Sequence, residues 1–235
     1  MLSNTTYCAD LVKNQDPDRF LLTQFAPQAR REALYALFAF NYEIAKTREV
    51  VSETQLGLIR LQWWREAIEK LYAGQVLDHE VLQNLADIIH AHDLPREDFD
   101  ALIYAREFDL EDVLPTDLDG FLHYADYVST PLMRLVMRVL GAQIEYEPVQ
   151  IVATNYAVAG LLRATIPFAR ARRCYLPERL MVQNAVSINK LYELKRQDGL
   201  TEVIRTCAEQ FVENVPCENA FLKTSQHLAK LYIGQ

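Results

Sequence analysis

Apolar residues recur every three or four positions along almost the whole chain. This is the period at which side chains line one face of an α-helix. Together with the proline, glycine and capping positions, it predicts a short amino-terminal helix and then helices at about 28–53, 54–74, 79–92, 96–112, 117–140, 149–168, 187–196, 200–214 and 218–232. Pro131 should kink or divide the helix at 117–140, because a proline ring clashes with the preceding turn. The pattern therefore predicts an all-α bundle of eight to ten helices.

Two of the apolar stripes turn polar partway along. In "LYALFAFNYEIAKTRE", residues 34–49, the apolar start of the stripe is followed at the same spacing by Asn41, Tyr42, Ala45, Lys46 and Glu49. In the predicted helix 149–168, Arg163 lies among small apolar residues on a stripe that also carries Tyr156. A single inward Asn or Arg is most often a buried polar group that has found a partner. Two helices of this kind indicate a cavity between them, since helix bundles build their sites from facing side chains.

The candidate binding residues follow from these stripes. We predict ligand-pocket positions at Phe38, Asn41, Tyr42, Lys46, Trp64, Tyr156 and Arg163. The segment "RARR" adds the anion-binding candidates Arg170, Arg172 and Arg173, although such clusters are more often solvated surface.

Composition narrows the class of protein. The chain has 235 residues, half of them apolar, which one hydrophobic core can organise, so we expect a single domain over residues 1–235. Seven glycines are few for this length and favour helices over sheet. The formal charge of −8, without a long basic run, argues against nucleic-acid binding.

The expected location follows from three further features. No apolar run reaches the eighteen or so residues that span a bilayer. The amino terminus carries three Asp residues and resembles neither a secretory signal nor a basic transit peptide. The four cysteines lack the close spacing of zinc or redox motifs, which indicates a reducing compartment. We therefore expect a cytoplasmic protein of bacterial type that meets a membrane only from its inner face.

The sequence offers little support for a metal site or for common enzyme chemistries. The acidic segment "REFDLEDVLPTDLD" is rich in carboxylates, but those two positions apart point to different helix faces, so we expect most of them to be solvated. The five histidines also lack ligand spacing. No nucleophile elbow, phosphate loop or dinucleotide fingerprint occurs.

Several segments in order along the chain resemble the squalene/phytoene synthase superfamily. They are "ALYALFAFNYEIAKTREVVSE", "IRLQWWREAI", "AREFDLED" and "YLPERL". The resemblance implies the isoprenoid synthase fold, an all-α bundle around a central apolar cavity. In that family two prenyl diphosphates are joined head to head, with magnesium held by an aspartate motif on each of two facing helices.

Both aspartate motifs are degenerate on this resemblance. The first, Phe-Cys-Arg-x-x-Asp-Asp-x-x-Asp, falls on "FNYEIAKTRE" and places Ala45, Lys46 and Glu49 at its three acids. The second, Asn-x-x-Arg-Asp-x-x-x-Asp, retains Arg163 and places Ala164 and Phe168 at its two aspartates. We therefore assign no catalytic residue, no metal and no cofactor.

The aspartate-less pattern resembles a branch that includes an assembly factor of respiratory complex I. It implies a non-catalytic helper with a protein partner, complex I subunits or assembly intermediates being the candidates. An isoprenoid or lipid ligand and a peripheral membrane contact stay open. The alternative is a transferase of isoprenoid diphosphates whose Mg²⁺ site is rebuilt from Glu49, Glu53 and the acids of 107–112. A third hypothesis, a lipid carrier, requires a long open apolar cavity.

Overall fold

The computed structural model describes residues 6–142 and 145–234, and every regular element in these ranges is helical. The elements are α1 (Tyr7–Gln15), α2 (Pro17–Thr23), the 3-10 helix η1 (Gln28–Arg30), α3 (Arg31–Ala45), α4 (Thr47–Val50), α5 (Thr54–Tyr72), α6 (Glu80–Ala91), α7 (Arg96–Phe108), α8 (Leu118–Leu140), α9 (Tyr146–Arg163), α10 (Thr165–Arg170), α11 (Glu178–Gln183), α12 (Ile188–Tyr192), α13 (Gly199–Ala208) and α14 (Ala220–Ile233). The prediction of an all-α fold is confirmed.

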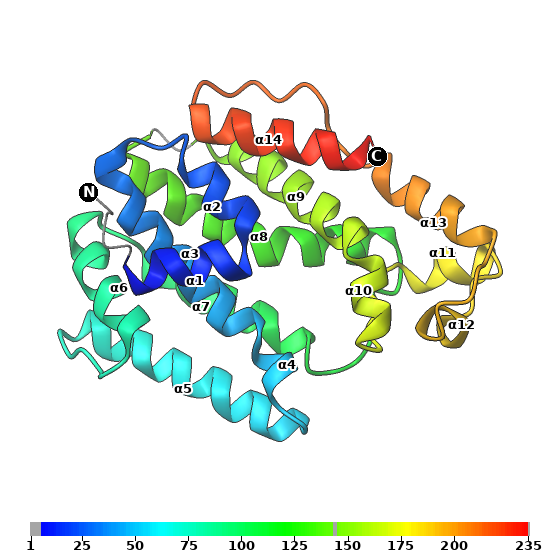
Figure 1. The fold of residues 1–235 in the computed structure, drawn as a ribbon, viewed down its shortest axis with the longest axis horizontal. Coiled ribbons are helices and arrows are strands. Elements are labelled where there is room, and N and C mark those ends of the chain that lie inside the picture. The colour runs from blue at the N-terminus through cyan, green and yellow to red at the C-terminus, as the bar shows by residue number, and fades with distance from the viewer. Residues whose placement is uncertain (1–5, 143–144, 235) are drawn as a thin grey trace.

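Helix α3 is the central element of the bundle. All residues from 33 to 41 are buried, and helices α1, α6, α7 and α8 pack around it (Figure 1). A helix that is apolar on all sides is typical of a core position. Within that core, the Phe40 ring meets Trp64 of α5 and Phe99 of α7 edge-on, with centroid distances of 5.6 and 5.3 Å. The apolar first part of the stretch 34–49 therefore lies in the core of the fold.

Helices α8 and α9 lie side by side, and α8 also packs against α3 and α7. Asp117 caps α8 by accepting a hydrogen bond from the Gly120 amide, and Gly141 ends it with the left-handed φ of 66° that glycine tolerates. The helix runs through Pro131 without dividing, contrary to part of the sequence prediction. Because α7 and α9 both pack against α8, tertiary contacts hold it together where the proline removes a hydrogen bond.

Two predicted helices are each interrupted by a break of one residue. The predicted helix 28–53 is η1, α3 and α4, with a break at Lys46. The predicted helix 149–168 is α9 and α10, with a break at Ala164. These two breaks, the division of the amino-terminal helix into α1 and α2, and the unpredicted short helix α11 explain why the fourteen α-helices of the described residues exceed the eight to ten expected.

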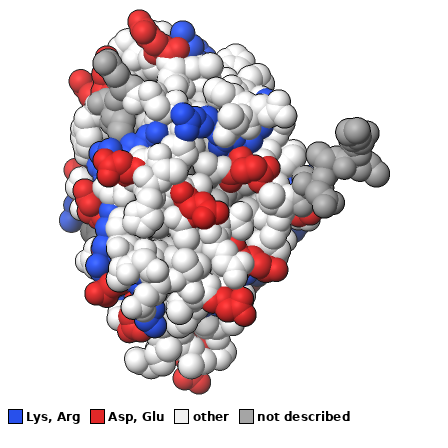
Figure 2. Space-filling model, turned by 90° about the vertical axis from the view of Figure 1, so that its left-hand side faces the viewer, with Lys and Arg blue, Asp and Glu red and all other residues white. Residues whose placement is uncertain are grey.

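The surface carries both signs of charge. On the end of the molecule shown in Figure 2, Asp and Glu side chains are scattered among uncharged residues, and Lys and Arg lie between them. None of the helices in residues 6–142 and 145–234 combines the length and apolar character needed to cross a bilayer.

Candidate functional site

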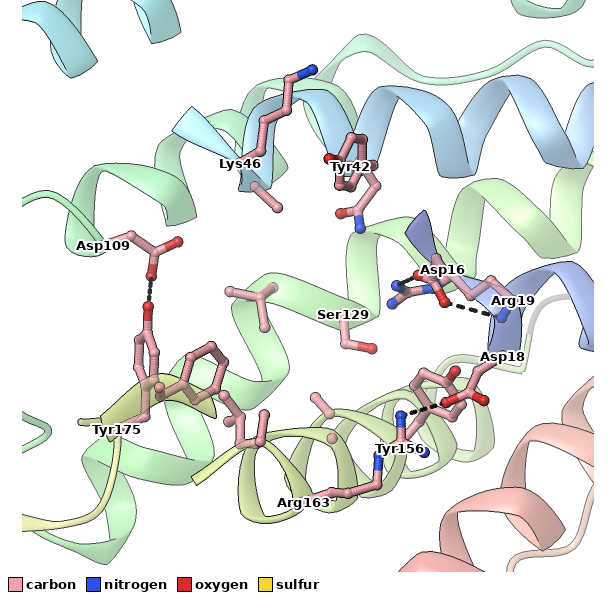
Figure 3. Close-up of a pocket in the computed structure, with 18 of the residues that line it drawn as sticks. Asp16, Asp18, Arg19, Tyr42, Lys46, Asp109, Ser129, Tyr156, Arg163 and Tyr175 are labelled. Carbon is pink, nitrogen blue, oxygen red and sulfur yellow. Dashed lines mark hydrogen bonds and ion pairs between the residues drawn. The ribbon is translucent and has the colours of Figure 1, made fainter. Parts of the chain in front are cut away.

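A cavity of about 420 Å³ lies where the carboxyl-terminal ends of α3 and α9 face each other (Figure 3). Helices α7, α8, α10 and α14 and the α1–α2 junction complete its walls. Its volume is within the range of about 300–1000 Å³ that small-molecule sites occupy. Among the residues predicted from the sequence, Asn41, Tyr42, Ala45, Lys46, Glu49, Tyr156, Arg163, Ala164, Phe168 and Arg173 line it.

Four of the candidate residues lie elsewhere. Trp64 is fully buried in the core, with its ring centroid 5.1 Å from that of His79. Phe38 packs on Phe221, with 6.3 Å between ring centroids, and lines a small neighbouring pocket instead. Arg170 and Arg172 are exposed, because consecutive residues at a helix end point in different directions. Of the arginine cluster, only Arg173 lines the cavity.

Asp109 is the most enclosed acid of the cavity, although the sequence predicted that most acids of its segment would be solvated. It is 8% exposed and accepts hydrogen bonds from the hydroxyls of Tyr124, at 2.6 Å, and Tyr175, at 3.0 Å. Nη1 of Arg106 lies 3.4 Å away. Burial and the nearby Asp109 carboxylate raise the pKa of both tyrosines well above the usual value, so both hydroxyls remain donors.

Two further acids line the opposite end of the cavity. Asp16 caps α2 through the Arg19 amide and also binds Nη1 of the Arg19 guanidinium at 2.5 Å. Asp18 accepts hydrogen bonds from Nη2 of Arg163, at 2.7 Å, and from the hydroxyl of Tyr232, at 2.8 Å. The Arg163 guanidinium also lies 3.9 Å from the centroid of the Tyr232 ring. Helices α2, α9 and α14 therefore meet in one polar cluster.

Lys46 and Glu49, two polar residues of the interrupted stripe, pair with other residues and not with each other. Nζ of Lys46 lies 2.7 Å from the buried carboxylate of Glu43, which also binds Arg60 at 2.9 Å. Glu49 instead lies 3.7 Å from Arg173. The break in the helix at Lys46 places Glu49 in a separate element, whereas Glu43 is one turn away on the same helix. Figure 3 shows the Lys46 ammonium directed away from the cavity centre, on the wall opposite Arg163.

The carboxylates of this cavity do not fit a magnesium site of the kind that the family resemblance implies. Mg²⁺ requires several oxygen ligands that converge in near-octahedral geometry. Asp16, Asp18 and Asp109 each contact an arginine, as Glu49 does. Within residues 6–142 and 145–234, no three His, Cys, Asp or Glu side chains are grouped as a metal ion would need. The cavity is therefore lined by paired charges and by apolar residues, which include Val128, Leu161 and Phe168.

Of the acids proposed for a rebuilt ion site, Glu49 and Asp109 line the cavity, each beside an arginine, and the others lie outside it. Glu107 binds Arg65 at 2.7 Å, Asp112 binds Arg48 at 2.8 Å, and neither lines the cavity. Glu53 is exposed at the start of α5.

Sequence reasoning missed the cavity residues that come from distant parts of the chain. These are Asp16, Asp18, Arg19, Tyr124, Tyr175 and Tyr232. An Asp before a Pro is typical of a helix start, but the approach of Asp16 to Tyr156 and Arg163 depends on tertiary packing. Tyr175 lies within a segment that carries the family resemblance, which is the signal that could have identified it, whereas Asp109 was already among the acids of the transferase alternative.

A sequence model of the squalene/phytoene synthase family matches residues 12–213. The chain belongs to this family. It is 27% identical over 232 residues to the mouse protein called NADH dehydrogenase (ubiquinone) complex I, assembly factor 6, covering 93% of this chain and 70% of the mouse protein. It is also 26% identical over 159 residues to the presqualene diphosphate synthase of Rhodopseudomonas palustris, covering 66% of this chain and 56% of that enzyme.

Solved structures agree with the fold. The crystal structure of a dehydrosqualene synthase in complex with ligand superposes with a TM-score of 0.79 at 16% identity, over 95% of this chain and 82% of the synthase. At this identity the similarity establishes the fold alone. The cavity of the present chain therefore has to be interpreted from its own residues.

Proposed function

We propose that this chain is a non-catalytic squalene/phytoene synthase family member that takes part in the assembly of respiratory complex I by binding a protein partner. The observation that carries the proposal is the charge pairing of the cavity. Each of the carboxylates Asp16, Asp18 and Asp109 is already held by an arginine. The similarity to a complex I assembly factor along most of the chain supports the proposed role in complex I assembly.

The residues at the assigned motif positions support the loss of prenyl transfer. Ala45, Lys46, Ala164 and Phe168 occupy four of the five positions where the family pattern has an aspartate. Expelling a diphosphate requires its developing negative charge to be stabilised, which is commonly the largest catalytic contribution of such a site. Arginines that are neutralised by neighbouring carboxylates supply little of this stabilisation. Binding a substrate without stabilising its transition state does not accelerate the reaction.

The alternative function is transfer of isoprenoid groups at an atypical site. The partial similarity to a presqualene diphosphate synthase favours it. It requires the ion pairs of the cavity to open, so that Asp16, Asp18 or Asp109 can take part in metal binding. The lipid-carrier hypothesis gains less support, because the cavity is lined by paired charges and the neighbouring apolar pocket has only about 10 Å³.

Deletion of the gene in its own host tests the proposed role. We expect the NADH:quinone oxidoreductase activity of membranes to fall and complex I subassemblies to accumulate on native gels, while succinate dehydrogenase activity stays constant. The wild-type gene should restore the activity, and the gene of a catalytic dehydrosqualene synthase should not. Normal complex I together with loss of an isoprenoid product would support the transferase instead.

A further inference from the structure

A second, apolar pocket lies directly beside the main cavity. Its walls include Leu22, Phe38, Leu132 and Met133, and it has about 10 Å³ of free space, roughly what one water molecule needs. The two spaces share three wall residues, Arg19, Ser129 and Tyr156, and these therefore form the partition between them.

Arg19 projects into this partition from α2, whereas Ser129 belongs to α8 and Tyr156 to α9, and four contacts fix the position of Arg19. Its guanidinium carbon lies 5.7 Å from the centroid of the Phe38 ring and 5.4 Å from that of Tyr156. Asp16 binds the guanidinium and also accepts from the Arg19 amide. Figure 3 shows Asp16 and Arg19 together beside Ser129 and Tyr156. A cation held between two aromatic faces and a carboxylate is a stable, well-ordered arrangement.

The walls of the small pocket beside Arg19 are mostly apolar. Leu22, Phe38, Met133 and Phe221 line this pocket, and all four are buried. If the Arg19 side chain were short, the space that it now occupies would connect this pocket to the main cavity. The connected space would form an apolar arm of that cavity. The present cavity lacks such an arm because the side chain fills it.

We propose that Arg19 is a selectivity plug, which fills an apolar arm of the cavity and excludes ligands that carry a long hydrocarbon chain. The cavity then accepts compact ligands that combine a polar group with a small apolar part. The shape of the cavity sets this limit, whichever partner the protein assists. It also predicts that a short side chain at this position converts the cavity into a site for long-chain lipids.

Titration of the purified full-length chain with dodecanol, an uncharged long-chain probe, tests the proposal by calorimetry and native mass spectrometry. We expect Arg19→Ala to bind dodecanol at least about tenfold more tightly than wild type, since burying about two methylene groups suffices for that gain. Arg19→Met should show no gain, because an unbranched apolar side chain still fills the arm. Arg163→Ala is the matched control, since it removes another guanidinium of the same cavity on a different wall.

Three results would overturn the proposal. They are equal dodecanol affinity in wild type and a folded Arg19→Ala variant, an equal gain in Arg19→Met, and an equal gain in Arg163→Ala. If circular dichroism shows that Arg19→Ala does not fold, Tyr156→Ala opens the partition from α9 and should give the same gain. A folded Tyr156→Ala variant without the gain would also contradict the proposal.

Discussion

Arg163 of α9 and Asp18 of α2 form an ion pair across 145 residues of sequence, with 2.7 Å between Nη2 and Oδ2. The same aspartate accepts a hydrogen bond from Tyr232 of α14, whose ring lies beneath the Arg163 guanidinium. The cluster therefore joins the two ends of the chain at the rim of the cavity.

Removal of the Arg163 side chain should loosen the carboxyl-terminal helix. The side chain is 49% exposed, so we expect Arg163→Ala to lower the free energy of unfolding by only about 1 kcal/mol, from the ion pair and the ring contact together. Amide hydrogen exchange in α14 should become faster. Arg179→Ala, which removes a more exposed pair with Asp117, is the control and should have almost no effect. Equal effects of the two variants on α14 would contradict the assignment.

Asp109 should matter far more to stability than its neighbour Asp112. Asp109→Ala leaves two tyrosine hydroxyls and Arg106 without their buried acceptor, which should cost about 3 kcal/mol in urea unfolding. Asp112→Ala breaks an exposed pair with Arg48 and should cost less than about 1 kcal/mol. If the two variants proved equally stable, Asp109 would not be the buried centre of this network.

The protein should lose stability as the pH rises above about 9. Burial raises the pKa of the Cys8 and Cys207 thiols to about 12 and that of Cys174 to about 11, from an ordinary value of 9.0. Between the ordinary thiol pKa of 9.0 and the native values of about 11 to 12, the unfolded chain has released thiol protons that the native state still binds. Rising pH therefore favours unfolding. The slope should be at most about 1.4 kcal/mol per pH unit for each thiol. Urea midpoints at pH 8 and pH 10 measure it, and Cys207→Ala should reduce the slope; a flat profile would contradict the prediction.

Carboxylates at the assigned motif positions should create a magnesium site that the wild type lacks. We expect the variant Ala45→Asp, Lys46→Asp, Ala164→Asp and Phe168→Asp to be destabilised without metal by charge repulsion. Saturating Mg²⁺ should then raise its melting temperature by roughly 5–10 °C, which corresponds to metal at about a hundred times the dissociation constant. The wild type should not respond. A similar saturable response of the wild type would show that its own carboxylates already bind the ion.

The sequence predicted the helices well where the helical pattern of apolar residues continued over many positions. It also predicted the two helices that carry the cavity, because Asn41, Tyr42 and Arg163 interrupted stripes that were otherwise apolar. It did not predict the breaks at Lys46 and Ala164, which depend on how neighbouring helices pack. Tyr232 reaches Asp18 across 214 residues, a relationship that no local pattern contains.

The candidate residues that lie outside the cavity are of two kinds, each with its own physical reason. Phe38 and Trp64 are large aromatic side chains on apolar helix faces, and such faces usually form the core. The sequence prediction treated Arg170, Arg172 and Arg173 as one cluster, but at the end of α10 their side chains point in different directions. Periodicity identifies an inward face, but it does not distinguish a packed core from the wall of a cavity.

The most direct test of the central claim is release of diphosphate by the purified chain from farnesyl or geranylgeranyl diphosphate in the presence of Mg²⁺, with an active dehydrosqualene synthase as the positive control. The paired charges around Asp16, Asp18 and Asp109 predict no release above that of a protein-free sample. Saturable release that requires Mg²⁺ and is lost in a folded Asp109→Asn variant would contradict the account.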